Sequence, residues 1–412
     1  MLALERRELI QILYEELPDK SKVLLGRAVA GIRQSENGVE VELADGTSQR
    51  GDLVIGADGV HSIVREAMWQ HADAAEPGLI TDDERNIMMR NWVCLFGLGP
   101  GEPGLRNELS VTSYPGKRAA MTITQPRLTT FLFFWKAETA TALSRPESAA
   151  RFTAQDADRA AAGVAHLPVN ETMVFGDFWN KRTRAQLSHI EEGVLTRWHY
   201  GRLVLAGDAV HKVTPNTAYG GNLAIEGVAV LANQLHRAVV EQRRRREGSG
   251  RCDGDGDQEE KDEATPSWGA ASLAQADLEA AFRAYQARHE SRAREVCATA
   301  HWVTRLQTWD TPWLKFWSLY VMPLSDRKAL ARIIGALVRR APLLDFVPLD
   351  RGPEGKVRWE HGETRSDDGY GKPWRGALAA LAAVGLVASF AFFIRRWPLS
   401  GYTAREALSS DL

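Results

Sequence analysis

Apolar residues along this 412-residue chain concentrate in two segments that share one pattern: a short apolar strand, a turn containing glycine and aspartate, and a helix. One segment runs from Asp52 to Met68, and its strand ends at Gly56-Ala57-Asp58-Gly59. The other runs from Gly201 to Asn222, and its strand ends at Gly207-Asp208. Apolar residues then recur at helical spacing from Leu223 to Leu235. The pattern therefore predicts two strand-turn-helix units of an α/β fold.

Further elements follow from the same periodicity. The predicted elements are a helix over residues 4–17, strands over residues 28–33 and 39–43, a mixed sheet over residues 91–135 and a long helix over residues 272–309. The first helix places Leu9, Ile12 and Leu13 on one face and ends at Pro18. We expect the mixed sheet to roof a substrate pocket.

The turn after the second strand carries the candidate chemistry. A buried strand would deliver Asp208 to the carboxyl edge of the sheet, where open α/β sheets bind their ligands. Gly220 and Gly221 permit close approach of the backbone, and the amides at the start of the next helix favour an anion or a developing negative charge. This combination suits a ligand with a ribose hydroxyl at one end and an electron-rich ring at the other. An ordinary strand-turn-helix with a capping aspartate is the alternative.

The two turns resemble known motifs. The stretch G-D-A-V-H-K-V-T-P, with the later Gly-Gly-Asn, is similar to the GD motif of the FAD-dependent monooxygenases of the aromatic hydroxylase type and their epoxidase relatives. The segment D-L-V-I-G-A-D-G-V-H-S-I-V-R is similar to the DG motif of the same enzymes, and it precedes the GD segment as it does in that family. The fungal epoxidases of meroterpenoid and indole-diterpene pathways are the group that the chain resembles most.

The resemblance implies roles for particular residues. It implies that Asp208 binds ribityl or ribose hydroxyls of FAD and that the loop through Gly220 and Gly221 lies beside the isoalloxazine ring. It implies that Asp58 lies near the pyrophosphate of FAD and helps to couple the cofactor to NADPH. Arg6, at the start of the first helix, matches an arginine that contacts FAD in the family; a solvated arginine at a helix end is the alternative.

Tyr114 is the candidate catalytic residue. It occupies the position of a tyrosine directed toward the substrate in the resembled prenyl-chain epoxidases, and a phenol there could orient an oxygenated substrate by hydrogen bonding. A turn tyrosine that packs on its own sheet is an equally good interpretation. His211 lies inside the GD motif, where we expect a packed or hydrogen-bonded role more than proton transfer.

The expected architecture is α/β, with a Rossmann-like FAD-binding domain that is incomplete at its amino end and a smaller substrate domain with a mixed sheet. The predicted boundaries are residues 1–75 and 190–240 for the FAD-binding domain, 76–189 for the substrate domain, 241–268 for a disordered loop, 269–350 for a helical region and 376–394 for a transmembrane helix. The family's first βαβ unit, with its G-x-G-x-x-G turn, has no counterpart, so we expect the sequence to start after it. The run from Gly99 to Gly104 fits that spacing but is interrupted by two prolines and precedes no apolar helix, so we interpret it as a loop.

Composition narrows the classes of function. The net charge of −2 argues against a nucleic-acid partner, because phosphate binding favours a basic excess. The three cysteines form no C-x-x-C pair, which predicts free thiols with no disulfide frame and no zinc site. The monooxygenase chemistry that the resemblance implies requires no metal either.

One carboxy-terminal segment predicts a membrane anchor. Residues Gly376 to Ile394 contain no charge, and at 1.5 Å per residue they nearly span the ~30 Å hydrocarbon core. Arg and Trp residues flank both ends, as interfacial anchors do. We expect a single-pass protein of the endoplasmic reticulum with its catalytic part in the cytosol; a buried helix of a soluble protein is the alternative.

The resemblance implies an FAD-dependent monooxygenase that uses NADPH and O2 to epoxidise or hydroxylate a hydrophobic, prenylated intermediate of secondary metabolism. A ring hydroxylase acting on a phenolic polyketide is the alternative within enzymes. A flavin-free remnant that serves only as a membrane-tethered partner is the alternative from another class.

Overall fold

The computed structural model describes residues 5–102, 109–144, 151–249, 273–324, 335 and 338–348. Its central feature is a three-stranded sheet in the order β10-β11-β4. The strands are β4 (Val54–Gly56), β10 (His199–Tyr200) and β11 (Leu203–Leu205). β4 and β11 come from the two predicted strand-turn-helix units and pair in parallel, with Gly56 opposite Leu205. Both predicted strands are therefore confirmed, and the structure shows that they are neighbours.

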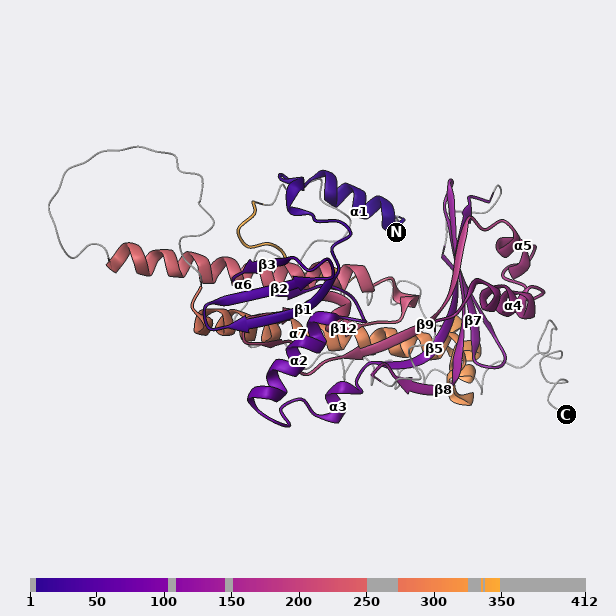
Figure 1. Ribbon diagram of the computed structural model, residues 1–412. Helices are drawn as coiled ribbons and strands as arrows, with labels where there is room; N and C mark the ends of the chain where they lie inside the picture. Colours follow the sequence, from indigo (N-terminus) through magenta and orange to yellow (C-terminus); the bar gives the residue numbers. More distant parts are fainter. Residues whose placement is uncertain are drawn as a thin grey trace.

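Helices cover this sheet. α2 (Ile63–Ala75) follows β4, α6 (Gly220–Ser249) follows β11, and α7 (Gln275–Gln307) runs beside α6 (Figure 1). The largest apolar core of the described residues lies among these elements and includes Met68, Leu205, Leu223 and Phe282. A second three-stranded sheet, β1-β2-β3, is antiparallel and packs its first strand against α2. Its strands are β1 (Val29–Ser35), β2 (Gly38–Leu43) and β3 (Ser48–Gly51).

The larger sheet has the order β12-β9-β5-β8-β7-β6. Its strands are β5 (Met89–Pro100), β6 (Leu109–Tyr114), β7 (Arg118–Thr124), β8 (Leu128–Ala142), β9 (Arg184–Val194) and β12 (His211–Lys212). Every pair is antiparallel, so the expectation of a mixed sheet was wrong. Tight hairpins such as the Pro115-Gly116 turn join neighbouring strands directly, and such connections make antiparallel pairs. The sheet also takes in β12, which lies beyond the predicted boundary of the substrate domain.

The two faces of the larger sheet differ. On one face, α4 (Ala154–Val164) and α5 (Phe175–Asn180) cover a core that includes Phe131, Phe133 and Phe175. On the other face, a smaller cluster includes Trp92, Met121 and Phe134. The guanidinium of Arg305, near the end of α7, lies 5.5 Å from the ring of Trp92, so α7 reaches this second face.

The remaining elements are short: α1 (Arg6–Glu15), η1 (Lys20–Lys22), α3 (Asp82–Arg85), η3 (Gly207–Ala209), η4 (Pro215–Thr217), α8 (Pro312–Phe316), η5 (Trp317–Val321) and η6 (Met322–Leu324). α1 confirms the first predicted helix, although it buries none of its residues. α7 confirms the long helix.

The predicted disordered loop over residues 241–268 was wrong at its start, because α6 continues to Ser249. Arg245 stabilises this extension by pairing with Glu241 one turn earlier and with Asp277 of α7. Residues 250–272 lie outside the described residues. The segment Gly376–Ile394 also lies outside them. No helix in the described part of the chain has the length and apolar character needed to cross a bilayer.

Candidate functional site

The two motif turns meet at the carboxyl edge of β4 and β11. Because these strands are parallel neighbours, Asp58 and Asp208 follow them on the same edge of the sheet. A direct contact joins the turns: Arg65 in α2 donates through Nη1 to the carbonyl oxygen of Ala209 at 3.1 Å. Its Nη2 donates to the carbonyl oxygen of Val60 at 2.8 Å. Arg65 thereby holds the DG turn and the GD turn together.

Asp58 caps the helix that follows it. Its Oδ1 accepts a hydrogen bond from the Ser62 hydroxyl at 2.5 Å, and its Oδ2 accepts from the Val64 amide at 3.1 Å. A carboxylate at a helix start satisfies amides that have no intrahelical partner and interacts favourably with the helix dipole. In this conformation Asp58 shapes the edge of the site while both of its oxygens are engaged by the protein.

Asp208 lies in η3, directly after β11. Gly207 before it has a φ of +62°, a left-handed conformation that favours glycine. The ammonium group of Lys212 forms a close ion pair with Oδ2 of Asp208, and both side chains are partly exposed. Among the described residues, none donates a hydrogen bond to Oδ1 of Asp208, so this oxygen can accept one from a ligand.

The loop from Pro215 leads into the first turn of α6. Ala218 adopts a left-handed φ of +56°, and the helix begins at Gly220. A Cβ added at Gly221 would meet no atom within 4 Å, so the backbone there borders open space. The first amides of any α-helix lack intrahelical partners. Gly220 and Gly221 therefore present free donors to that space.

Two buried histidines lie beneath the GD turn. His211 and His289 have ring centroids 5.4 Å apart, and both contact the ring of Trp198. Burial lowers the pKa of His211 to about 4. Burial, together with the charge that His211 would carry, lowers the pKa of His289 to about 3. Both rings are therefore neutral near pH 7, in agreement with the packed role expected for His211.

A buried ion pair fixes the GD helix to α7. Nε and Nη2 of Arg292 each donate to an oxygen of Glu226 at 3.0 Å, and both side chains are less than 10% exposed. Burial alone would lower the pKa of Arg292, but the contact with Glu226 outweighs it and the pKa is raised. The geometry is that of a bidentate guanidinium-carboxylate pair.

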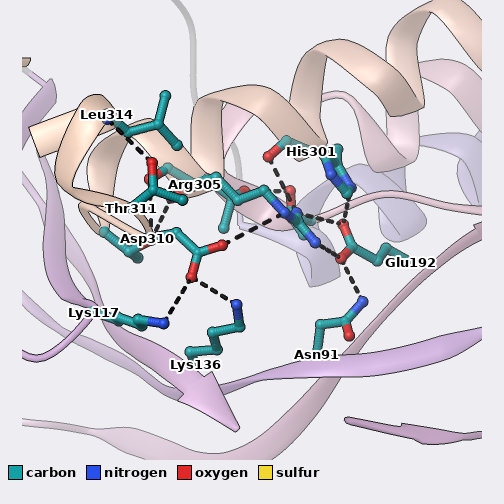
Figure 2. A network of polar contacts seen from close by, with 12 residues as sticks. Asn91, Lys117, Lys136, Glu192, His301, Arg305, Asp310, Thr311 and Leu314 are labelled. Atoms are coloured by element: carbon teal, nitrogen blue, oxygen red, sulfur yellow. Dashed lines mark hydrogen bonds and ion pairs between the residues drawn. The ribbon is translucent and has the colours of Figure 1, made fainter. Parts of the chain in front are cut away.

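A second polar network ties the end of α7 to the larger sheet (Figure 2). Arg305 donates to Glu192 of β9 at 2.8 Å. Asp310 accepts from Lys136 of β8 at 2.6 Å and lies 3.5 Å from Lys117. Burial would raise the pKa of Asp310, but the lysines outweigh burial and lower it. The network holds the sheet at a fixed position relative to the helix that also anchors the GD loop.

The other predicted site residues lie elsewhere. Tyr114 is 5% exposed in the core beneath α4 and α5, and its hydroxyl donates to the carbonyl oxygen of Pro168 at 2.7 Å. This geometry favours the packing role that the sequence left open. Arg6 is exposed at the start of α1, and the neighbouring Glu5 pairs with Arg184 of β9. The described contacts do not bring Arg6 or Tyr114 to Asp208.

Sequence reasoning did not select Lys212, His289 or the pair of Glu226 and Arg292. Lys212 could have been found, since it follows Asp208 by four residues within the motif. The others could not, because their partners are distant in sequence.

The residues at this edge of the sheet fit the half of an FAD molecule that contains the ribityl chain and the isoalloxazine ring. Asp208 offers an acceptor for a hydroxyl, and Gly221 borders space with free amides, as a ribityl chain and an isoalloxazine ring require. Exposed apolar side chains, Ile55 and Ile63 near the DG turn and Ile225 on α6, border the same units. The described residues include no G-x-G-x-x-G turn between a strand and a helix, so the fit covers the GD and DG contacts alone.

Comparison with known proteins defines the class. Residues 112–247 match the family model described as FAD binding domain. The chain is 32% identical over 368 residues to the FAD-dependent monooxygenase spyC of Aspergillus fumigatus, covering 88% of this chain and 71% of that protein. The chain therefore belongs to the FAD-dependent monooxygenase family.

Other relatives agree with this assignment. The chain is 34% identical over 363 residues to the FAD-dependent monooxygenase DEP2 of Fusarium langsethiae, covering 87% of this chain and 63% of DEP2. It thus spans less than two thirds of that relative's length. Among solved structures, Klebsiella pneumoniae HpxO complexed with FAD and uric acid has a TM-score of 0.54 at 17% identity, covering 81% of this chain and 72% of HpxO. This likeness confirms the α/β FAD-binding fold.

Proposed function

We propose that this protein is an FAD-dependent monooxygenase that uses NADPH and O2 to epoxidise or hydroxylate a prenylated intermediate of secondary metabolism. The observation that carries the proposal is the meeting of the GD and DG turns at one sheet edge, with a free oxygen of Asp208 beside the open start of α6. Bound FAD would supply the redox chemistry, and the protein would bind the cofactor, orient it and exclude water.

Asp208 and Lys212 are the residues that we assign to the flavin. Lys212 neutralises the Asp208 carboxylate through Oδ2 and holds it in place. Oδ1 would then be free to accept a hydrogen bond from a hydroxyl of the ribityl chain. Amides of Gly220 and Gly221 would donate to the electron-rich edge of the ring, where a helix start favours negative charge.

The second face of the larger sheet supports a large apolar substrate. The strand registers place Phe96 opposite Leu132, Leu132 opposite Met121, and Met121 opposite Val111, so these four side chains form a row across the sheet. Phe96 and Val111, at the two ends of the row, are 37% exposed, whereas Leu132 and Met121 between them are 3% exposed. Asn216 of the GD loop donates to Gln307 at the end of α7, and α7 also reaches this face. We infer that the exposed apolar side chains on this face suit a prenyl chain better than a small phenol.

A flavin titration tests the proposal. Added FAD should bind and give a protein-bound absorption band at about 450 nm, a property of the flavin ring itself. Asp208→Asn should weaken FAD binding about tenfold or more, because a hydrogen bond to a charged group contributes ~1.5–3 kcal/mol. Asp83→Asn, an exposed change in α3, is the matched control and should bind FAD as the native chain does. A chain that stays colourless would favour the flavin-free remnant.

Product analysis separates the enzyme alternatives. With NADPH and O2, a farnesylated arene should be oxidised in preference to a simple phenol. Val111→Asn should raise KM for the farnesylated substrate and leave FAD affinity unchanged, because Val111 lies on the apolar row. Preference for the phenol would favour the ring hydroxylase.

We also propose that Gly376–Ile394 anchors the protein in the endoplasmic reticulum membrane with its catalytic part in the cytosol. The support is the uncharged length of this segment and its flanking Arg and Trp residues. The expressed protein should stay in the membrane fraction after carbonate extraction, and a variant without residues 376–394 should be released. Release of both proteins would contradict the anchor.

A further inference from the structure

The helical segment that follows α7 presents large apolar side chains to solvent. It consists of α8, η5 and η6, which follow one another from Pro312 to Leu324. Steps of three and four residues separate its exposed apolar side chains, so they lie along one side of the helical segment. They are each between 43% and 61% exposed: Trp313, Phe316, Leu319, Tyr320 and Leu324. We call this surface the aromatic face.

The rings of the aromatic face contact one another. The ring centroid of Phe316 lies 5.6 Å from that of Trp313 and 5.2 Å from that of Tyr320. Val321 of the same segment is buried, so the segment has an inner and an outer side. η5 is a π-helix, a rare geometry that is frequent at functional sites. The exposed rings therefore form one continuous strip, whereas single exposed apolar residues are common on any protein.

Contacts with the larger sheet hold the aromatic face in place. The segment begins at Thr311, whose hydroxyl oxygen accepts a hydrogen bond from the amide of Leu314 at 3.2 Å (Figure 2). Asp310, just before it, pairs with Lys136 of β8. Lys136 lies opposite Trp92 in the strand register, on the face of the sheet that also carries the apolar row. The aromatic face is thus attached to the sheet beside the proposed substrate face.

The chemistry of the segment indicates what covers this face. From Thr311 to Leu324 the sequence contains no Asp or Glu and a single Lys. The ammonium of that residue, Lys315, lies 5.4 Å from the ring centroid of Trp309. Tryptophan and tyrosine combine an apolar ring with a polar atom, so they concentrate where hydrocarbon meets water at a membrane surface. A helical surface with these residues and no negative charge suits the interfacial region of a bilayer.

The helix α1 provides a contrast within the same chain. α1 also exposes apolar side chains, including Ile10 and Leu13, but it carries Glu8 in its first turn and Glu15 at its end. Anionic lipids give the cytoplasmic surface of a membrane a negative potential, which disfavours carboxylates. Both helical segments expose apolar surface, and their charges differ. Charge therefore favours the segment from Pro312 to Leu324 for contact with a bilayer.

We propose that the aromatic face inserts into the interfacial region of a lipid bilayer, with the rings of Trp313, Phe316 and Tyr320 at the level of the headgroups. The proposed anchor Gly376–Ile394 lies farther along the chain and would keep this face near a membrane, so the contact is inferred in part from the proposed function. The contact would also hold the larger sheet at the membrane, in which a prenylated substrate dissolves.

A fluorescent label on the aromatic face tests the inference in the full chain. Tyr320→Cys and, separately, Leu324→Cys are labelled with bimane and mixed with phosphatidylcholine vesicles, with or without a nitroxide group near the top of the acyl chain. The nitroxide lipid should quench the label at both positions. Gln49→Cys, an exposed change in β3, is the matched control and should keep its emission. Native protein treated with bimane supplies the blank for the native cysteines.

Carbonate extraction of the same vesicles separates this contact from the anchor. Quenching at Tyr320→Cys and Leu324→Cys in protein that carbonate removes would support the aromatic face and contradict the anchor. No quenching at either position would overturn the inference, whether or not the protein stays with the vesicles. Equal quenching at Gln49→Cys would overturn it too, because the contact would not be specific. Emission that changes with protein concentration and not with the nitroxide lipid would assign the face to a second copy of the chain, which also overturns the inference.

Discussion

Acidification should destabilise this protein through the two histidines buried beneath the GD turn. Burial lowers the pKa of His211 to about 4 and that of His289 to about 3, whereas an unfolded histidine has a pKa of about 6.5. Near pH 7.5 both rings are neutral in the folded and the unfolded states, so they add no pH dependence. Below pH 6.5 the unfolded chain binds two protons that the folded protein does not accept. Stability is therefore lost as the pH falls from about 6.5 toward about 4.

The size of the effect follows from proton linkage. At pH 5.5 an unfolded histidine is about nine-tenths protonated, which lowers the free energy of unfolding by ~1.4 kcal/mol for each buried histidine. His211 and His289 together should cost about 3 kcal/mol between pH 7.5 and pH 5.5. This is a large part of the free energy of unfolding of a typical folded protein, which is roughly 5–15 kcal/mol. His199, whose pKa burial also lowers to about 4, adds to the slope.

Urea unfolding at pH 7.5 and at pH 5.5 measures the effect. His289→Asn removes one titrating ring but keeps a side chain that can hydrogen-bond the backbone of Leu223, as His289 does. The variant should lose about 1.4 kcal/mol less than the native chain over this pH change. His199 is present in both proteins, so its contribution cancels when their pH dependences are compared. His166→Gln, an exposed change after α4, is the control and should match the native chain. An identical pH dependence in the His289→Asn and native proteins would refute the reasoning.

Three further changes test single contacts. Glu226→Gln leaves Arg292 buried without its anion, so it should lower the free energy of unfolding by about 3–5 kcal/mol in thermal or urea melts. A loss under about 1 kcal/mol would mean that water reaches the pair. Tyr114→Phe removes the hydrogen bond to the carbonyl oxygen of Pro168, so it should lower the free energy of unfolding by ~1 kcal/mol and leave turnover unchanged. A fall in kcat at unchanged stability would instead favour a catalytic role for Tyr114. Asp310→Asn should cost ~1–3 kcal/mol, since it weakens the contact with Lys136, and an unchanged melting temperature would show that the network is dispensable.

The strand-turn-helix units could be predicted because their signals are local. An apolar run of strand length followed by helical periodicity identified β4, β11 and the helices after them. The shared edge of Asp58 and Asp208 was not predicted, and it follows from the parallel pairing of β4 and β11, whose carboxyl ends lie together. The same local signal failed at the end of α6, where a run of arginines was interpreted as disorder. Arginine and glutamate are good helix formers, and Arg245 pairs with Asp277 of α7, which sequence periodicity does not reveal.

Other features depend on contacts between distant residues. The alternation of apolar and polar residues along the strands of the larger sheet does not show which strands pair or in which direction. Its antiparallel arrangement was therefore missed. Arginine is usually exposed, and a single sequence gives no reason to bury Arg65 or Arg202. Tyr114 matched a family position, but its hydroxyl bonds to Pro168, which is 54 residues away in the chain.

The placement of α7 explains how the two halves of the site are held together. Near its middle, Arg292 binds the GD helix through Glu226. Farther along, Thr304 contacts the hydroxyl of Thr214 in the GD loop at 2.7 Å. Beyond that, Arg305 binds β9 of the larger sheet. A displacement of α7 would therefore move the proposed flavin edge and the apolar sheet face together. Glu226→Gln should therefore lower the affinity for FAD and the affinity for the substrate together, although Glu226 contacts neither ligand.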